Sequence, residues 1–247
     1  MPNTTNAIEA RRLSKIYGSG RTAVKALADI DLTIRGAEFV AVMGPSGSGK
    51  STLLNLLGAL DHPTTGEVIL AGQEITTQKE SELYLVRRKQ IGFVFQAFHL
   101  APTLNSLDNV LLPALPDGIT KERRARATEL LERVGLGERL KRRPGELSAG
   151  ERQRVALARA LIMDPPIILA DEPTGNLDSA TGAEVIRLIE EINQELGKTF
   201  VLVTHDQRVA GRAHRVIYLR DGGLCTAEEA GLDPVNPHTR DWGKNAA

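Results

Sequence analysis

The strongest constraint on this chain is a glycine-rich segment at 44–51, Gly-Pro-Ser-Gly-Ser-Gly-Lys-Ser, which fits the pattern G-x-x-x-x-G-K-[ST]. An apolar run at 38–43 precedes it and a leucine-rich stretch at 51–60 follows it, so we expect a strand, a loop and a buried helix. Glycines let backbone N–H groups turn inward around phosphates, and the helix N-terminus adds its positive dipole end. A flexible Gly/Ser turn is the alternative, but the flanking elements favour nucleotide binding.

The residue types in this loop predict separate roles. We expect Lys50 to reach the β- and γ-phosphates and the Ser51 hydroxyl to bind Mg²⁺. The predicted cofactors are therefore ATP and Mg²⁺. The residues expected to hold ATP here are Gly44, Pro45, Ser46, Gly47, Ser48, Gly49, Lys50, Ser51 and Thr52.

Two adjacent carboxylates, Asp171 and Glu172, follow a second apolar run at 167–170. Carboxylates at a strand end are most often plain solvent-facing residues. Beside a phosphate loop, however, Asp171 is expected to hold Mg²⁺, directly or through water. Glu172 is expected to accept a proton from the attacking water or to position it. The pair therefore predicts ATP hydrolysis as well as binding.

Short apolar runs alternate with helical patterns along the chain. Besides the strands that precede these two motifs, we expect strands at 91–95 and 200–203 and an amphipathic helix at 183–196 that ends at Gly197. This alternation predicts an α/β protein with a mainly parallel sheet. The short strands between about residues 8 and 43 fit an additional N-terminal β subdomain, and the helical stretch in the middle fits an insert.

The expected organisation is a single nucleotide-binding domain at 1–224. Its core lies at about 1–95 and 162–224, and its helical insert at about 96–161. The polar segment at 225–247 is expected to be a poorly ordered tail.

Composition narrows the classes of partner. Lys plus Arg and Asp plus Glu each number 31, so the basic excess typical of nucleic-acid binding is missing and no nucleic acid is expected. The single cysteine, Cys225, excludes an internal disulfide and fits a reducing compartment. No apolar run approaches the ~20 residues that span a bilayer, and residues 1–6 lack the features of a signal peptide. We therefore expect a cytoplasmic chain whose membrane role, if any, comes through a partner.

Several downstream motifs resemble ABC ATPases in order and spacing. The stretch at 147–151, Leu-Ser-Ala-Gly-Glu, is similar to the family signature, and 152–161 continues it. The resemblance covers about residues 8–224. Residues 176–178 are similar to the D-loop of the family, and His205 is similar to its switch histidine. Gln96 resembles the Q-loop glutamine, and Tyr17 resembles the aromatic residue that stacks on adenine.

The resemblance implies a site shared by two chains. Two ATP molecules would lie between two copies turned head to tail, with the signature of one copy completing the site of the other. The implied catalytic residues are Glu172, His205, Lys50 and Gln96. The implied Mg²⁺ ligands are Ser51, Gln96 and Asp171, and the residues implied to contact ATP in trans are Ser148, Gly150 and Asp178.

Taken alone, these residues have ordinary interpretations as well. His205 fits a core or capping histidine, and Tyr17 fits a packed strand residue. Asp178 fits a helix N-cap, a role compatible with a contact across the dimer. Gln96 fits a polar residue at a strand end.

Two residues depart from the usual signature. Ala149 stands where glycine is usual, and its Cβ would crowd a backbone with positive φ. Glu151 stands where glutamine is commoner. Because Ser148 and Gly150 are intact, we expect activity with a changed dimer affinity.

The segments 58–68, 92–96 and 174–178 resemble the lipoprotein-release and macrolide-efflux branch (LolD- and MacB-type) of the family. This resemblance implies an integral membrane permease subunit as partner, driven by mechanical motion, and a location on the inner face of the cell membrane. A soluble ABC ATPase acting on nucleic acid or ribosomes is the alternative. Against it, no long coiled coil interrupts the chain between Lys50 and Ser148, and there is one nucleotide domain. A non-hydrolysing scaffold is disfavoured by the intact Lys50 and Glu172.

Overall fold

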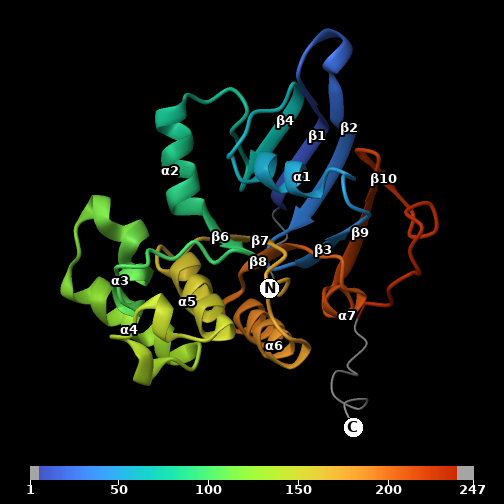
Figure 1. Cartoon of the computed structure of the whole chain (residues 1–247). Helices are drawn as coiled ribbons and strands as arrows, with labels where there is room; N and C mark the ends of the chain where they lie inside the picture. Colours follow the sequence, from blue (N-terminus) through green and yellow to red (C-terminus); the bar gives the residue numbers. More distant parts are fainter. Residues whose placement is uncertain (1–5, 238–247) are drawn as a thin grey trace.

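A six-stranded sheet divides the molecule into two layers in the computed structural model, which describes residues 6–237 (Figure 1). The strand order is β10-β9-β3-β8-β7-β6. The neighbouring pairs from β9 to β6 are parallel, and β10 is antiparallel to β9. The strands are β3 (Phe39–Met43), β6 (Ile91–Phe95), β7 (Ile167–Asp171), β8 (Thr199–Val203), β9 (Arg215–Arg220) and β10 (Gly223–Cys225).

The central strands are apolar except at Thr199 and Asp171, as expected of a sheet with both faces covered. Along β3, Phe39, Ala41 and Met43 belong to one hydrophobic core, and Val40 and Val42 belong to the other. The same alternation runs through β7 and β8. The sheet therefore separates two cores that draw on the same strands.

The upper layer in Figure 1 holds an antiparallel sheet of order β2-β1-β4-β5 together with two helices. Its strands are β1 (Asn6–Tyr17), β2 (Val24–Arg35), β4 (Thr65–Leu70) and β5 (Gln73–Glu74), with a 3₁₀ turn η1 (Gly20–Thr22) between the first two. The helices are α1 (Lys50–Leu57) and α2 (Glu80–Gln90). The predicted fold class, a mainly parallel sheet with an N-terminal antiparallel subdomain, is confirmed.

The lower layer is helical. Between β6 and β7 the chain forms α3 (Ser106–Leu111), η2 (Leu112–Asp117), α4 (Lys121–Arg133), η3 (Gly137–Arg139), η4 (Pro144–Glu146) and α5 (Ala149–Leu161). Alongside lie α6 (Ser179–Leu196) and α7 (Gln207–Ala210). Helix α6 ends at Gly197 (φ 61°), as predicted, but begins four residues before residue 183 because Asp178 caps it.

The expected disorder of 225–247 is wrong for the part of it that the structure describes. Cys225 belongs to β10, and Leu232 and Val235 pack against the lower core. The Val235 N–H donates to the Tyr218 hydroxyl at 2.9 Å. These apolar anchors offset the cost of ordering a polar segment; residues 238–247 lie outside the described part. Within residues 6–237, no helix is long and apolar enough to cross a membrane.

Candidate nucleotide site

The site lies where four parallel strands, β3, β8, β7 and β6, end side by side. In open α/β sheets, ligands bind at the carboxyl ends of the strands. The phosphate loop follows β3, His205 lies just beyond β8, Glu172 directly follows β7, and Gln96 follows β6. Residues that are more than 100 positions apart are therefore brought to one edge.

The backbone of the phosphate loop requires glycine. Gly47 and Gly49 have φ values of 79° and 102°, which L side chains rarely adopt. Gly44 has an ordinary φ but passes so close to β9 that a Cβ would lie 2.1 Å from the carbonyl oxygen of Leu219. The loop therefore curls tightly onto the N-terminus of α1, which begins at Lys50.

Lys50 curls back across its own loop. Its Nζ donates to the carbonyl oxygens of Gly44 and Pro45, both at 2.8 Å. Burial lowers the pKa of this ammonium, while the Glu172 and Asp171 carboxylates oppose the shift. The positive charge is thus held between the loop and the acidic pair.

Asp171 lies at the end of β7, facing the start of α1. The Ser51 hydroxyl donates to its Oδ1 at 3.5 Å. Burial raises the pKa of Asp171, and the hydrogen bond from Ser51 and the charge of Lys50 act against that rise. A hydroxyl and a carboxylate are the hard oxygen donors that Mg²⁺ takes when phosphate oxygens complete its shell, so the residues present fit this ion.

Glu172 and His205 form a pair beside them. Oε1 of Glu172 lies 2.9 Å from Nδ1 of His205, and the ring N–H donates to the carboxylate. The Glu172 side chain is mostly buried, whereas that of His205 is 74% exposed. Glu172 has a φ of 46°, and its N–H donates to the carbonyl oxygen of Val203 at 3.0 Å. Nine other non-glycine residues of the described part also have positive φ, so it is the contact with His205 that distinguishes this carboxylate.

Gln96 is held by Asn176, the first residue of the D-loop-like segment, a contact that the sequence alone does not predict. Nε2 of Gln96 donates to Oδ1 of Asn176 at 3.3 Å, and Nδ2 of Asn176 donates to the carbonyl oxygen of Gln96 at 2.9 Å. Directly before Gln96, the carbonyl oxygen of Phe95 accepts from Nε2 of Gln153 at 3.4 Å. Gln153 is fully buried in α5, so this contact joins the signature helix to the strand end that carries Gln96.

The signature residues cap α5. The Ser148 hydroxyl accepts from the N–H of Glu151 at 3.2 Å, and the Glu151 carboxylate accepts from the N–H of Ser148 at 2.7 Å. This is a capping box, a role that glutamate fills as well as the commoner glutamine does. Ala149 occupies the first helical turn and is not at positive φ, so the expected crowding at this residue is wrong.

Gly150 and Asp178 lie where α5 and α6 begin. Gly150 is buried, and a Cβ there would lie 2.2 Å from Cγ2 of Thr181. The carboxylate of Asp178 accepts from the N–H groups of Ala180 and Thr181 at 3.1 and 3.0 Å. The N-cap interpretation of Asp178 is therefore correct, and its contact across a dimer stays a prediction.

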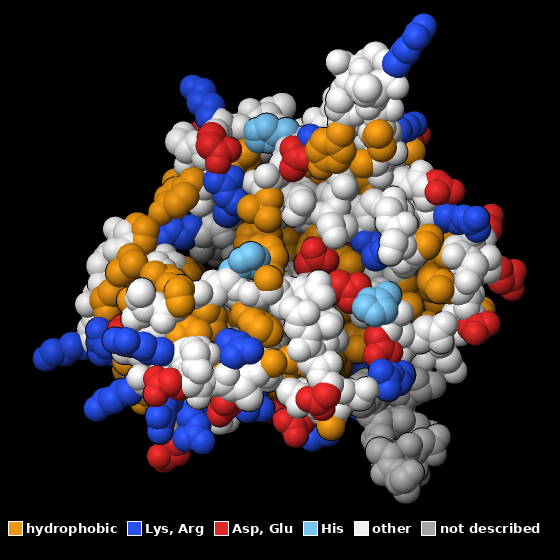
Figure 2. Space-filling view, in the orientation of Figure 1, with side chains coloured by type: hydrophobic (Ala, Val, Ile, Leu, Met, Phe, Trp, Pro, Cys, Tyr) orange, Lys and Arg blue, Asp and Glu red, His pale blue; other side chains and the backbone are white. Residues whose placement is uncertain are grey.

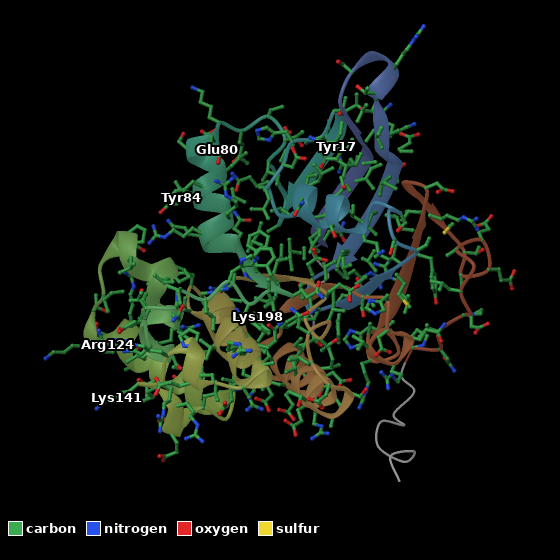
Figure 3. All side chains as sticks on the ribbon, viewed as in Figure 1. Tyr17, Glu80, Tyr84, Arg124, Lys141 and Lys198 are labelled. Atoms are coloured by element: carbon green, nitrogen blue, oxygen red, sulfur yellow. The ribbon has the colours of Figure 1, made fainter. Side chains whose placement is uncertain are left out.

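Tyr17 ends β1 close to α1 (Figure 3). It is 42% exposed, and its hydroxyl donates to Oδ2 of Asp61 at 2.7 Å. The structure therefore places Tyr17 at the flank of the phosphate loop, and stacking on adenine stays a prediction.

A glycine-rich loop after a buried strand, a lysine inside it and an acidic pair at a nearby strand end define a P-loop ATPase. The family described as "ABC transporter" matches residues 27–175. The chain belongs to this family, of which it forms the ATP-binding cassette.

Relatives and solved structures agree with this assignment. The chain is 47% identical to the lipoprotein-releasing system ATP-binding protein LolD of Alcanivorax borkumensis, covering 91% of this chain and 99% of that protein. It is 49% identical to the macrolide export ATP-binding/permease protein MacB 1/2 of Paracoccus denitrificans, covering 93% of this chain. It spans about a third, 34%, of that protein's length. The dimeric ABC transporter cassette MJ0796 superposes with a TM-score of 0.82 at 46% identity, covering 89% of this chain and 97% of the cassette. The same cassette in a dimeric post-hydrolysis state with ADP and Pi matches equally well.

Proposed function

We propose that this chain binds ATP between two head-to-tail copies and hydrolyses it to drive an integral membrane permease. The observation that carries the proposal is the Glu172–His205 pair, at 2.9 Å, on the same sheet edge as the phosphate loop. A protein that only binds phosphate does not need a carboxylate oriented by a histidine at that place.

The chemistry divides among the residues of that edge. Lys50 and the inward N–H groups of the loop bind the β- and γ-phosphates. Ser51, Asp171 and Gln96 would hold Mg²⁺, which neutralises charge on the phosphates when it is bound. Glu172 takes a proton from the attacking water, and His205 fixes the direction of that carboxylate and contacts the γ-phosphate. Tyr17 stacks on the adenine base.

The signature supports a site shared by two copies. Ser148 is exposed at the N-terminus of α5, where N–H groups and the helix dipole favour a phosphate. Gly150 and Asp178 lie beside it at the neighbouring helix starts. In the dimer, these residues face the ATP that is bound to the phosphate loop of the other copy. The dimeric state of the MJ0796 cassette supports this arrangement.

A groove next to Gln96 suits the permease. A cavity of about 300 Å³ lies among α2, β6 and α5, with Gly92, Phe95, Arg88 and Met163 in its lining. Tyr84, which Figure 3 labels, is exposed on α2, one turn before Arg88. A short amphipathic segment of a permease would bury the apolar part of this lining.

The branch and the location follow from the relatives. The names LolD and MacB favour lipoprotein release or efflux, with the chain held on the inner face of the cell membrane through its permease. On the face shown in Figure 2, Lys and Arg side chains are interspersed with Asp and Glu, a pattern that disfavours a nucleic-acid client. A ribosomal or nucleic-acid client is the alternative outcome of the test below.

The test uses Glu172→Gln as bait with ATP in membranes solubilised in mild detergent. The matched control is Glu172→Gln combined with Lys50→Ala, which removes the phosphate contact and should stay monomeric. We expect the purified bait with ATP to elute at twice the monomer mass, and the bait in solubilised membranes to retain an integral membrane protein that the control loses. Recovery of ribosomes or nucleic acid alone would overturn the transporter proposal. A bait that stays monomeric in ATP would overturn the shared site.

A further inference from the structure

Three side chains meet at the flank of the phosphate loop. Nζ of Lys15 donates to Oδ1 of Asp61 at 2.7 Å and to the carbonyl oxygen of His62 at 2.6 Å. The hydroxyl of Tyr17 donates to the other carboxylate oxygen of Asp61 at 2.7 Å. Lys15 and Tyr17 come from the end of β1, and Asp61 comes from the segment that follows α1. Each oxygen of this carboxylate is therefore used by a side chain of β1.

The cluster is built more firmly than an ordinary surface ion pair. The side chain of Lys15 is only 13% exposed, and that of Asp61 is 30% exposed. The N–H of His62 adds a third hydrogen bond to the carboxylate, at 2.7 Å. Burial acts to raise the pKa of Asp61, but the hydrogen bonds from Lys15 and Tyr17 outweigh it and lower that pKa. The carboxylate is thus held in its charged form.

The Tyr17 ring is fixed in a particular way. The Lys15 ammonium lies over one of its faces, 4.8 Å from the ring centroid. Its hydroxyl is tied to Asp61, and burial and this carboxylate raise the pKa of Tyr17 while a hydrogen bond with the Thr52 side chain lowers it. Thr52 lies in the first turn of α1, directly after the phosphate loop. The ring therefore sits beside that loop with one face covered and its edge tethered, yet the residue remains 42% exposed.

We propose that Asp61 and Lys15 are positioning residues that hold the Tyr17 ring as a one-sided stacking platform for the base of the nucleotide. The proposal rests on the proposed stacking role of Tyr17. A platform that is fixed before the base arrives loses less conformational freedom on binding than a free surface tyrosine. The phosphate loop precedes α1 and Asp61 follows it, so one end of this stretch of chain binds the phosphates and the other end holds the ring that stacks on the base.

The experiment compares two probes, ATP and inorganic triphosphate, each with Mg²⁺, by calorimetric titration of the full chain. Only ATP has a base to stack. Tyr17→Leu should lower the affinity for ATP by about 5- to 150-fold, the range that base–aromatic stacking supplies, and leave the affinity for triphosphate unchanged. Asp61→Ala and Lys15→Met should each lower the affinity for ATP by about 3- to 10-fold, a part of that range, and again leave the affinity for triphosphate unchanged. Asp61→Glu should recover part of the loss.

The matched control is Glu67→Ala, an exposed carboxylate on β4 of the same subdomain, which should change neither affinity. Asp61→Ala added to Tyr17→Leu should have no further effect on ATP, because the platform is already gone. Equal losses for ATP and triphosphate in Asp61→Ala would mean a general structural role and overturn the positioning role. A Tyr17→Leu chain that keeps its preference for ATP would instead overturn the stacking function itself. If Tyr17→Leu loses that preference but Asp61→Ala keeps it, only the positioning role fails.

Discussion

Replacing Gly150 with alanine should destabilise the contact between α5 and α6. A Cβ at this position would lie 2.2 Å from Cγ2 of Thr181, closer than real Cβ contacts allow. The threonine cannot simply turn away. Its Oγ1 donates to Oδ2 of Asp178 at 2.6 Å, and a β-branched side chain in a helix has few χ1 rotamers. Either that hydrogen bond breaks or the two helix starts move apart.

The expected loss is about 1–3 kcal/mol in the free energy of unfolding, the range measured for overpacked cores. Urea denaturation followed by far-UV circular dichroism measures it. Gly145→Ala is the matched control, since a Cβ at Gly145 meets nothing within 4 Å and its φ is not positive. That substitution should stay within about 0.5 kcal/mol of wild type.

Thr181→Ser supplies the decisive comparison, because serine lacks Cγ2 but keeps the hydroxyl that bonds Asp178. The Gly150→Ala/Thr181→Ser chain should recover most of the lost stability, and ATP-dependent dimerisation should fall in the single variant and return in the double. Stability losses in the double variant that equal the sum of the two singles would refute the clash as the cause.

Other substitutions test the site and its surroundings. Glu172→Gln should reduce steady-state ATP turnover by about 10²- to 10⁴-fold while ATP binding persists, and turnover equal to wild type would contradict the role as base. His205→Ala should lower turnover in wild type but add little to Glu172→Gln, because residues that act as a unit are not additive in kinetics. Gln153→Leu removes the hydrogen bond from Nε2 to the Phe95 carbonyl oxygen but also removes the buried Oε1, which has no hydrogen-bond partner among the described residues, so unfolding by urea should change little. The loss of the contact with Phe95 should nevertheless lower turnover. The pKa of Asp61 in the folded protein lies below its ordinary value of 3.8. The charged carboxylate therefore stabilises the fold above pH 3.8, and this contribution is lost as pH falls through the folded-state pKa. The free energies of unfolding of wild type and Asp61→Asn in urea should differ at pH 7 and converge in acid.

Much of the fold could be predicted because its signals are local. The strand at 91–95, the helix end at Gly197 and the strand–loop–helix around 44–51 are each fixed by a short pattern in the sequence. Helix α2 gives a weaker signal. It is rich in charge, buries only Leu83 and Val86, and is preceded by Lys79 in place of a usual capping residue. The order of strands in the sheet has no local signal at all.

The site residues also differ in how well the local sequence predicts them. The phosphate loop and the acidic pair could be predicted because their residues are adjacent in sequence. The partners of Gln96 and Tyr17 could not, since Asn176 and Asp61 lie 80 and 44 residues away from them. Short polar side chains of this kind look like loop residues until the sheet brings them into contact. The catalytic and trans-acting roles assigned to the site residues stay predictions.

The alternation along β3, β7 and β8 has a further consequence. Because successive side chains of each strand enter opposite cores, a substitution at Phe39 or Phe200 alters only the packing under the helical layer, whereas one at Val40 or Val201 alters only the layer around α1. Energies of such substitutions should be additive across the sheet and coupled within one face. Natural variation can therefore change the packing on one face of the sheet while the packing on the other face changes independently.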